Sequence, residues 1–82
     1  MTHQEVFQKV VGILKPYVKN EVALSSVSES TNILDDLKVN SARLVDVVLE
    51  FEDMFKIEIA DADADKVDTV GDAVRLIEAK LA

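Results

Sequence analysis

The chain of 82 residues has no cysteine, no tryptophan and a single histidine, His3. Without cysteine it can form neither a disulfide bond nor a thiolate metal site. With one histidine it offers no pair of histidine ligands and no Ser–His–Asp triad built on a core histidine, and we expect His3 to be solvated near the terminus. We therefore predict no catalytic residues, no metal site and no enzymatic activity.

Long apolar runs and clusters of basic residues are missing as well. No stretch approaches the roughly 18 apolar residues of a membrane-spanning helix, and the first residues lack the basic-then-apolar pattern of a signal segment. We expect a cytoplasmic protein without membrane insertion. The formal net charge of −7 at pH 7 argues against nucleic acid as a partner, because phosphate binding needs clustered lysine and arginine.

The negative charge is concentrated in one part of the chain. Residues 46–65 hold eight acidic residues and one base, whereas residues 1–45 hold five of each sign and residues 66–82 hold three of each. A solvated face is the ordinary explanation of such a run. Its confinement to one region instead predicts a surface that basic partners recognise.

Two glycines and one proline in the whole chain favour helices over strands. The first helix is expected to begin with a capping box of Thr2 and Glu5 and to end near Lys15, because Pro16 lacks a backbone N–H. We expect Tyr17 to pack at the end of this helix. Helical spacing predicts a buried face that consists of Phe7, Val10, Val11, Leu14 and Val18.

Two further long helices follow the same kind of spacing. The second is predicted from about Ser41 to Phe55, with Asn40 as its N-cap. The last begins near Thr69, with Thr69 and Asp72 as a capping pair. The predicted core residues of the second helix are Leu44, Val48, Phe51 and Phe55, and those of the last are Val70, Ala73, Val74, Ile77 and Leu81.

The segment between the first two long helices lacks a regular apolar period. Residues 19–40 predict a long ordered loop with one short helical turn around residues 21–24. Ile33, Leu34 and Leu37 are expected to pin this loop to the core. A loop of this length in a small domain tends to be functional.

The fold class that we predict is all-α. A short helix of one or two turns is expected over residues 61–66, because this segment is rich in alanine and aspartate. The predicted architecture is a bundle of three main helices plus one short helix, with a long loop between the first and second helices. We expect one domain over residues 1–82.

One face of the second long helix combines a hydroxyl with apolar and acidic residues. Ser41 begins this face, and Val45 and Leu49 follow it, rotated about 100° from the core stripe. We predict that Val45 and Leu49 are exposed, and the alternative is that they complete a thin core. Glu52 continues the face, and the neighbouring acidic row is Asp46, Glu50 and Asp53. Because a helix N-terminus favours anions, a phosphate ester on Ser41 would be stabilised there.

Three segments resemble motifs of the acyl carrier protein family. Residues 36–41 (DLKVNS) are similar to its D-L-G-x-D-S motif, and residues 51–59 (FEDMFKIEI) to its L-E-E-x-F-x-I-x-I segment. Residues 69–74 (TVGDAV) are similar to the T-V-G-D-A-V start of its last helix. The three segments follow in the family's order and spacing, so the resemblance covers essentially the whole chain.

The resemblance implies a carrier that catalyses nothing itself. Ser41 matches the serine to which a phosphopantetheinyl transferase attaches 4′-phosphopantetheine from coenzyme A, and the thiol of that arm holds acyl groups as thioesters. Many members shelter the acyl chain between their helices. We expect a monomer that docks on acyl-transferring or acyl-processing enzymes with basic surfaces. The positions that match the family's partner contacts are Leu37, Ala42, Val45, Asp46, Leu49, Glu52, Asp53 and Asp61.

Several residues around Ser41 depart from the family pattern. Asn40 replaces the aspartate before the serine, which keeps a helix cap but removes a charge near the transferase's metal and cofactor site. Arg43 replaces an acidic or polar residue and could pair with Asp46 or contact the phosphodiester. Lys38, Ala42 and Ala60 stand where the family has glycine, leucine and proline. These departures favour a specialised lipid or secondary-metabolite pathway over housekeeping fatty acid synthesis.

Two other functions stay open. An aminoacyl or peptidyl carrier would use the same arm, but such carriers are often less acidic, so the net charge of −7 favours an acyl role. An unmodified acidic interaction module with the carrier fold is the second, because Asn40 alters the attachment motif.

Overall fold

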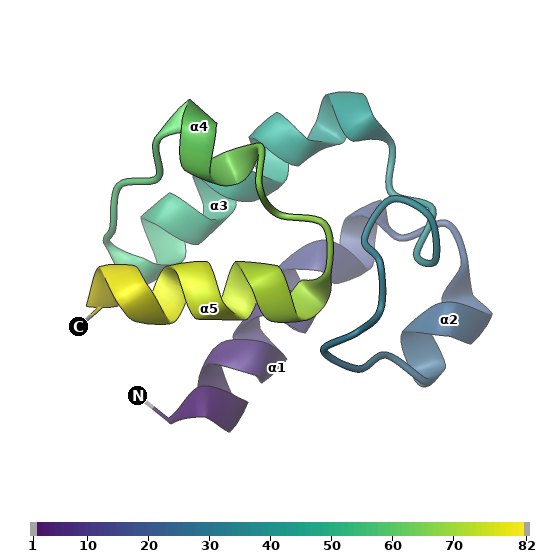
Figure 1. The fold of residues 1–82 in the computed structure, drawn as a ribbon. Coiled ribbons are helices and arrows are strands. Elements are labelled where there is room, and N and C mark those ends of the chain that lie inside the picture. The colour runs from purple at the N-terminus through teal and green to yellow at the C-terminus, as the bar shows by residue number, and fades with distance from the viewer. Residues whose placement is uncertain (1, 82) are drawn as a thin grey trace.

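The computed structural model describes residues 2–81 and is mostly helical (Figure 1). One isolated bridge joins Asn32 to Thr69, and no strand occurs in this part of the chain. The helices are α1 (His3–Leu14), α2 (Glu21–Ser25), α3 (Leu44–Phe55), α4 (Asp61–Ala64) and α5 (Val70–Leu81), with 3₁₀ turns η1 (Lys15–Tyr17) and η2 (Ser41–Arg43). The predicted all-α class is confirmed, and the short turn expected in the long loop is helix α2.

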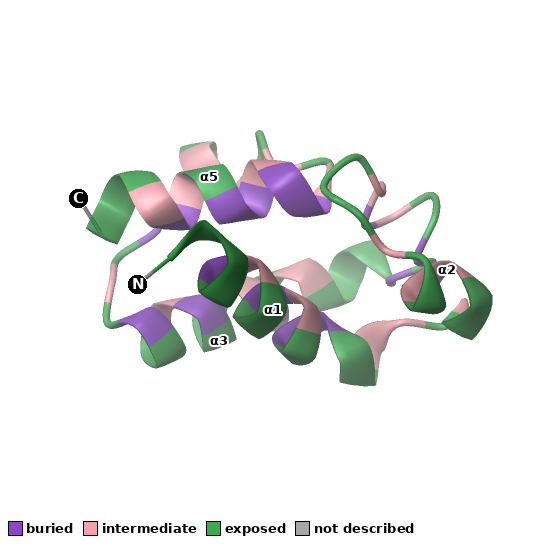
Figure 2. Ribbon diagram, turned by 90° about the horizontal axis from the view of Figure 1, so that it is seen from below, coloured by how far each residue is buried: buried purple, intermediate pink, exposed green. Residues whose placement is uncertain are grey.

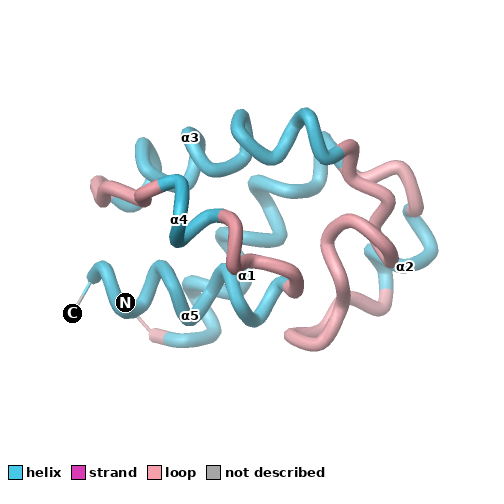
Figure 3. Tube along the Cα trace, turned by 45° about the horizontal axis from the view of Figure 1, so that its top comes forward, coloured by secondary structure: helices cyan, strands magenta, loops and turns pink. Residues whose placement is uncertain are grey.

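The three long helices enclose the core. Figure 2 shows that the buried residues of α1, α3 and α5 lie on the sides that face one another. In the view of Figure 3, helix α4 lies between α3 and α5. Within the described residues, no helix combines the length and the apolar character that a membrane span requires. The buried hydrophobic residues are Val6, Val10, Ile13, Leu14, Ile33, Leu37, Val39, Val47, Phe51, Phe55, Ile59, Val70, Ala73, Val74 and Ile77.

Helix α1 begins as predicted, because Thr2 and Glu5 form a reciprocal capping box. It ends at Leu14, and the chain continues through Pro16 as the tighter turn η1. The predicted buried face is partly wrong. Val10 and Leu14 are buried with Val6 and Ile13, whereas Phe7, Val11 and Val18 are half-buried. Two adjacent faces of this helix are apolar, and the contacts with α5 and α3 select the one that begins at Val6.

Helix α3 has a 3₁₀ entrance rather than one continuous α-helix from Ser41. The side chain of Asn40 accepts a hydrogen bond from the backbone N–H of Ala42 at 2.9 Å, so Asn40 is the predicted cap, although of η2. Phe51 and Phe55 are buried as predicted. Val47 is buried, whereas Leu44 and Val48 are only half-buried, and all three side chains line a cavity.

The loop after α2 is held against the start of α5 by backbone hydrogen bonds. The N–H of Ile33 donates to the carbonyl of Asp68 at 2.9 Å, and the N–H of Gly71 donates to that of Glu29 at 2.8 Å. A Cβ on residue 71 would lie 2.8 Å from the same carbonyl oxygen, so glycine permits this close approach. Ile33 is buried as expected, and Leu34 is half-buried.

Helix α5 begins with the predicted capping pair. The hydroxyl of Thr69 accepts a hydrogen bond from the N–H of Asp72 at 3.1 Å, and the carboxylate of Asp72 accepts one from the N–H of Thr69 at 3.0 Å. The predicted core residues of α5 are buried except Leu81, which is 40% exposed. Leu81 is the last residue of α5, and the prediction is wrong for it.

His3 is exposed, as the sequence predicts, but it also contacts two carboxylates that the sequence did not predict. Its Nε2 lies 3.0 Å from a carboxylate oxygen of Glu29, and its Nδ1 lies 3.0 Å from one of Glu78. The side chain is half-exposed, but it links the start of α1 to the loop and to α5. The sequence conceals this contact because Glu78 is 75 residues away.

Candidate functional site

Ser41 is the first residue of η2 and is exposed to solvent. The turn around it is fixed by Asn40, whose side chain caps Ala42 and whose carbonyl accepts a hydrogen bond from the N–H of Arg43 at 2.8 Å. Among residues 2–81, the structure gives the Ser41 hydroxyl no hydrogen-bond partner. A rigid turn therefore presents an accessible hydroxyl at the entrance to α3.

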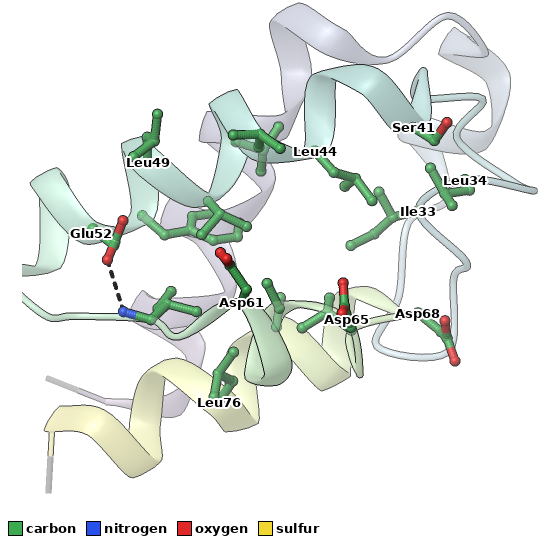
Figure 4. Close-up of a pocket in the computed structure, with 18 residues that line it drawn as sticks. Ile33, Leu34, Ser41, Leu44, Leu49, Glu52, Asp61, Asp65, Asp68 and Leu76 are labelled. Atoms are coloured by element: carbon green, nitrogen blue, oxygen red, sulfur yellow. Dashed lines mark hydrogen bonds between the residues drawn. The ribbon is translucent and has the colours of Figure 1, made fainter.

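A cavity of about 600 Å³ begins beside Ser41 and extends between α3, α4 and α5. Figure 4 shows Ser41 and Leu34 together at one end, with Glu52 at the other. Leu76 reaches the cavity from α5, and Asp61 and Asp65 reach it from the α4 side. The other lining residues are Ile33, Leu44, Val45, Val47, Val48, Leu49, Phe51, Ile59, Ala64, Val67, Asp68 and Ala73. Apolar side chains of α3, both buried and exposed, thus form one wall of this cavity.

The outer face of α3 is apolar and acidic, as predicted. Val45 is 66% exposed and Leu49 is 57% exposed, so the alternative that they complete the core is wrong. Asp53 is exposed beside them, and Asp46 is partly exposed. We call Val45, Asp46, Leu49 and Asp53 the docking face.

Part of the acidic row is held by other side chains. The Nη1 atom of Arg43 lies 3.2 Å from Oδ2 of Asp46, and this contact is the surface ion pair that the sequence suggested. The hydroxyl of Tyr17 donates a hydrogen bond to Glu50, and this bond raises the pKa of Tyr17. Tyr17 therefore does more than pack, because it joins η1 to α3. Exposed ion pairs of this kind contribute little to stability, so their main effect is to orient the charges.

Two acidic residues predicted as partner contacts lie at the cavity. A carboxylate oxygen of Glu52 accepts a hydrogen bond from the N–H of Ile59 at 2.8 Å, drawn as a dashed line in Figure 4. Glu52 thereby ties the segment before α4 to α3. Asp61 is exposed at the start of α4 and lines the cavity from the opposite side.

The structure corrects the role predicted for Leu37. The sequence suggested a partner contact, but the Leu37 side chain has no exposed surface and belongs to the core. Its carbonyl accepts hydrogen bonds from the N–H groups of Lys19 and Asn20, which fixes the loop backbone there. Leu34, from the same loop, lies at the Ser41 end of the cavity instead. The predicted neighbour Ala42 is exposed in η2.

The chain is similar to known carrier proteins along nearly its whole length. A family model described as "Phosphopantetheine attachment site" matches residues 6–77. The acyl carrier protein of Thermotoga maritima is 42% identical, with 98% of this chain and 96% of the relative covered. That of Lactobacillus acidophilus is 40% identical, with 95% of each covered. A solved structure of the acyl carrier protein from Enterococcus faecalis has a TM-score of 0.80 at 41% identity and covers 98% of this chain and 99% of that one.

Proposed function

Because the chain belongs to the acyl carrier protein family, we propose that Ser41 bears the 4′-phosphopantetheine arm and that the docking face presents this arm to partner enzymes. As a carrier of this family, the protein is not an enzyme. When bound, the arm supplies a terminal thiol that holds an acyl group as a thioester. A chain without cysteine has no thiol of its own for this role.

The observation that carries the proposal is the position of Ser41. Its exposed hydroxyl lies at the meeting point of three features, namely the rigid turn of η2, the open end of the cavity and the docking face on α3. A transferase therefore has free access to the oxygen that it would modify. An acyl chain on the arm could turn from that point into the cavity.

The proposed partners are a phosphopantetheinyl transferase, which uses coenzyme A, and acyl-transferring or acyl-processing enzymes with basic surfaces. Val45 and Leu49 offer apolar contacts, and the carboxylates of Asp46 and Asp53 attract cations. Partner binding should weaken as the ionic strength rises, because salt screens exposed charges. The monomeric state, the cytoplasmic location and the single domain stay predictions.

Loading in vitro tests the attachment residue. We expect a broad-specificity transferase with coenzyme A to add one phosphopantetheine to the wild-type protein, measured by intact mass. Ser41→Ala should gain nothing. Ser30→Ala, which removes an exposed serine in the loop, should load like the wild type. Addition of the arm to Ser41→Ala would overturn the assignment.

We further infer a specialised lipid or secondary-metabolite pathway with dedicated partners. Support comes from the residues around the attachment site, where Asn40, Ala42 and Arg43 replace the family's usual aspartate, leucine and acidic or polar residue. Intact mass of the protein from its native host would identify the acyl group on the arm. An aminoacyl group would favour the peptidyl carrier, and a protein that is always bare would favour the unmodified interaction module.

A further inference from the structure

We propose that Arg43 selects partner enzymes by charge. The partner that fits this carrier presents an acidic side chain to Arg43, beside the attachment serine, and basic side chains to the acidic residues at the far end of α3. The inference rests on the proposed attachment at Ser41 and specifies the kind of enzyme surface that the docking face accepts. A partner with basic residues along its whole contact surface is disfavoured.

The two ends of α3 differ in charge. Residues 36–46, around the attachment serine, hold two acidic and two basic residues, so their formal charges cancel. Residues 52–61, beyond the other end of the docking face, hold four acidic residues and one base, which leaves a net charge of −3. The formal charge therefore becomes negative along α3 with increasing distance from Ser41, and a partner surface that matches it must vary in the opposite sense.

The acidic residues nearer to Ser41 are held by other side chains of the protein. The Nη1 atom of Arg43 lies 3.2 Å from Oδ2 of Asp46, and the hydroxyl of Tyr17 donates a hydrogen bond to Glu50. The side chain of Arg43 is nevertheless 65% exposed. Because an exposed ion pair is weak, a carboxylate of a partner can share the guanidinium or replace Asp46 as its acceptor, whereas a lysine or arginine at that place is repelled.

The acidic residues at the far end keep their charge for a partner. The side chain of Asp53 is 90% exposed, and its ion pair with Lys56 is 4.0 Å long. Asp61 is exposed, and no ion pair to it is formed within residues 2–81. Figure 4 shows Glu52 at the end of the cavity opposite Ser41. Ten residues separate Arg43 from Asp53, which is roughly 15 Å at the rise of an α-helix, so the partner's acidic and basic groups should be about this far apart.

An alternative role for Arg43 is contact with the phosphate of the arm. The ion pair with Asp46 directs the guanidinium toward the C-terminal end of α3, whereas Ser41 lies on the N-terminal side of Arg43. The observed position therefore favours a group that faces a docked enzyme. A phosphate contact would act on the chemical step of arm transfer, and a docking contact would act on binding, so kinetics can separate the two roles.

The kinetics of arm transfer test the selection. The probe is a broad-specificity phosphopantetheinyl transferase with a basic docking surface, and intact mass follows loading at low ionic strength. Arg43→Glu should lower KM about fivefold or more at unchanged kcat, because a repulsion is removed, and Arg43→Gln should be intermediate. Lys9→Glu makes the same change in net charge on α1 and should change KM less than about twofold. A glutamate near the start of a helix is favourable, and circular dichroism verifies the fold of each variant.

Neutral variants at the far end should act in the opposite direction. Asp53→Asn with Asp61→Asn removes two charges that attract the transferase, so KM should rise about fivefold. Glu21→Gln with Asp35→Asn removes the same charge from exposed residues outside the docking face and should change KM less than about twofold.

Charge reversal on the transferase identifies the residue that faces Arg43. Each basic residue of its docking surface is replaced by glutamate in turn. We expect one replacement to lower KM for the wild-type carrier and to raise it for Arg43→Glu, because groups in contact are coupled in a double-mutant cycle. If every replacement weakens both carriers alike, no partner residue is selected by Arg43 and the proposal is wrong.

The outcomes separate this inference from the proposed function. A wild-type protein that gains no arm at Ser41 would overturn the proposed function and this inference with it. Normal loading with the same KM for the wild type, Arg43→Gln and Arg43→Glu would overturn the selection alone. A lower kcat for Arg43→Gln at unchanged KM would assign Arg43 to the phosphate of the arm and would also overturn the selection.

Discussion

Lys38 has a backbone φ of 58°, which lies in the left-handed region that side chains with a Cβ avoid. The position is the third residue of the DLKVNS segment, where the acyl carrier family has glycine. The loop needs this conformation because the preceding residue, Leu37, is buried while Asn40 caps the next turn. The sequence shows the departure from glycine, and the backbone conformation shows that it has a cost in stability.

Replacing Lys38 by glycine should stabilise the protein. The left-handed conformation costs about 1–2 kcal/mol for a residue with a Cβ. Glycine avoids this cost, but it also stabilises the unfolded chain by about 0.4–1 kcal/mol through greater conformational entropy, which offsets part of the gain. We expect Lys38→Gly to raise the free energy of unfolding by roughly 0.5–1 kcal/mol in urea titrations. Lys38→Ala is the control, since it removes the same charge but keeps the Cβ. Equal stability of the two variants would contradict the argument.

The residues that the sequence predicted well are those with a local cause. Val45 and Leu49 are exposed because helical rotation carries them away from Phe51, and Asn40 caps a turn because its side chain reaches the next N–H groups. Leu34 and Leu37 could not be assigned in this way. An irregular loop has no period, so which leucine is buried and which lines the cavity depends on tertiary contacts that the sequence does not specify.

At the scale of elements, the start of α5 is held by a cluster of hydrogen bonds around Asp72. Asp72 accepts hydrogen bonds from the N–H groups of Asp68 and Thr69, at 3.1 and 3.0 Å, and pairs with Arg75. These backbone N–H donors lower the pKa of Asp72 below its usual 3.8. The same turn holds the long loop through Gly71. Asp72 therefore supports both the helix and the wall of the cavity.

Removing the Asp72 cap should destabilise the protein. We expect Asp72→Ala to lower the free energy of unfolding by about 1–2 kcal/mol at pH 7. Because the folded pKa is lowered, this contribution is present above the unfolded value of 3.8 and is lost as the pH falls through the folded pKa. The difference in Tm between the wild type and Asp72→Ala should thus shrink below pH 4. Asp72→Asn keeps the acceptor oxygen and should be intermediate, and a constant difference at all pH values would contradict the prediction.

The elements themselves were largely predictable, because α1, α3 and α5 each carry a clear apolar period and recognisable caps. The face that each helix turns toward the core was harder to predict. In α1, the faces that begin at Val6 and at Phe7 both have helical spacing, and only packing against α5 and α3 decides between them. In α3, Val47 is buried, whereas Leu44 and Val48 are half-buried and pack against the edge of the core. This difference depends on the packing of neighbouring elements, which no pattern within one helix reveals.

At the scale of the whole molecule, His3 links three segments that are far apart in the sequence. The imidazole joins α1 to the loop through Glu29 and to α5 through Glu78, at 3.0 Å on each side. These two hydrogen bonds raise the pKa of His3 above its usual 6.5. No basic residue other than His3 contacts either carboxylate in the described part of the chain. The protonated form is thus the one that bridges both acids.

This bridge predicts a stability that declines with rising pH. Because the folded pKa of His3 is raised, its contribution is complete below pH 6.5 and is lost as the pH rises through the folded value. The Tm of the wild type should therefore fall between pH 6 and pH 9 by more than the Tm of His3→Gln, with the two curves converging at the alkaline end. Glu29→Gln and Glu78→Gln each remove one of the two contacts of His3, and each should reduce the dependence of Tm on pH. Added salt should flatten the wild-type curve, since both pairs are exposed. Parallel curves for the wild type and His3→Gln would mean that the bridge does not form in solution, and that α1 and α5 are held by their apolar contacts alone.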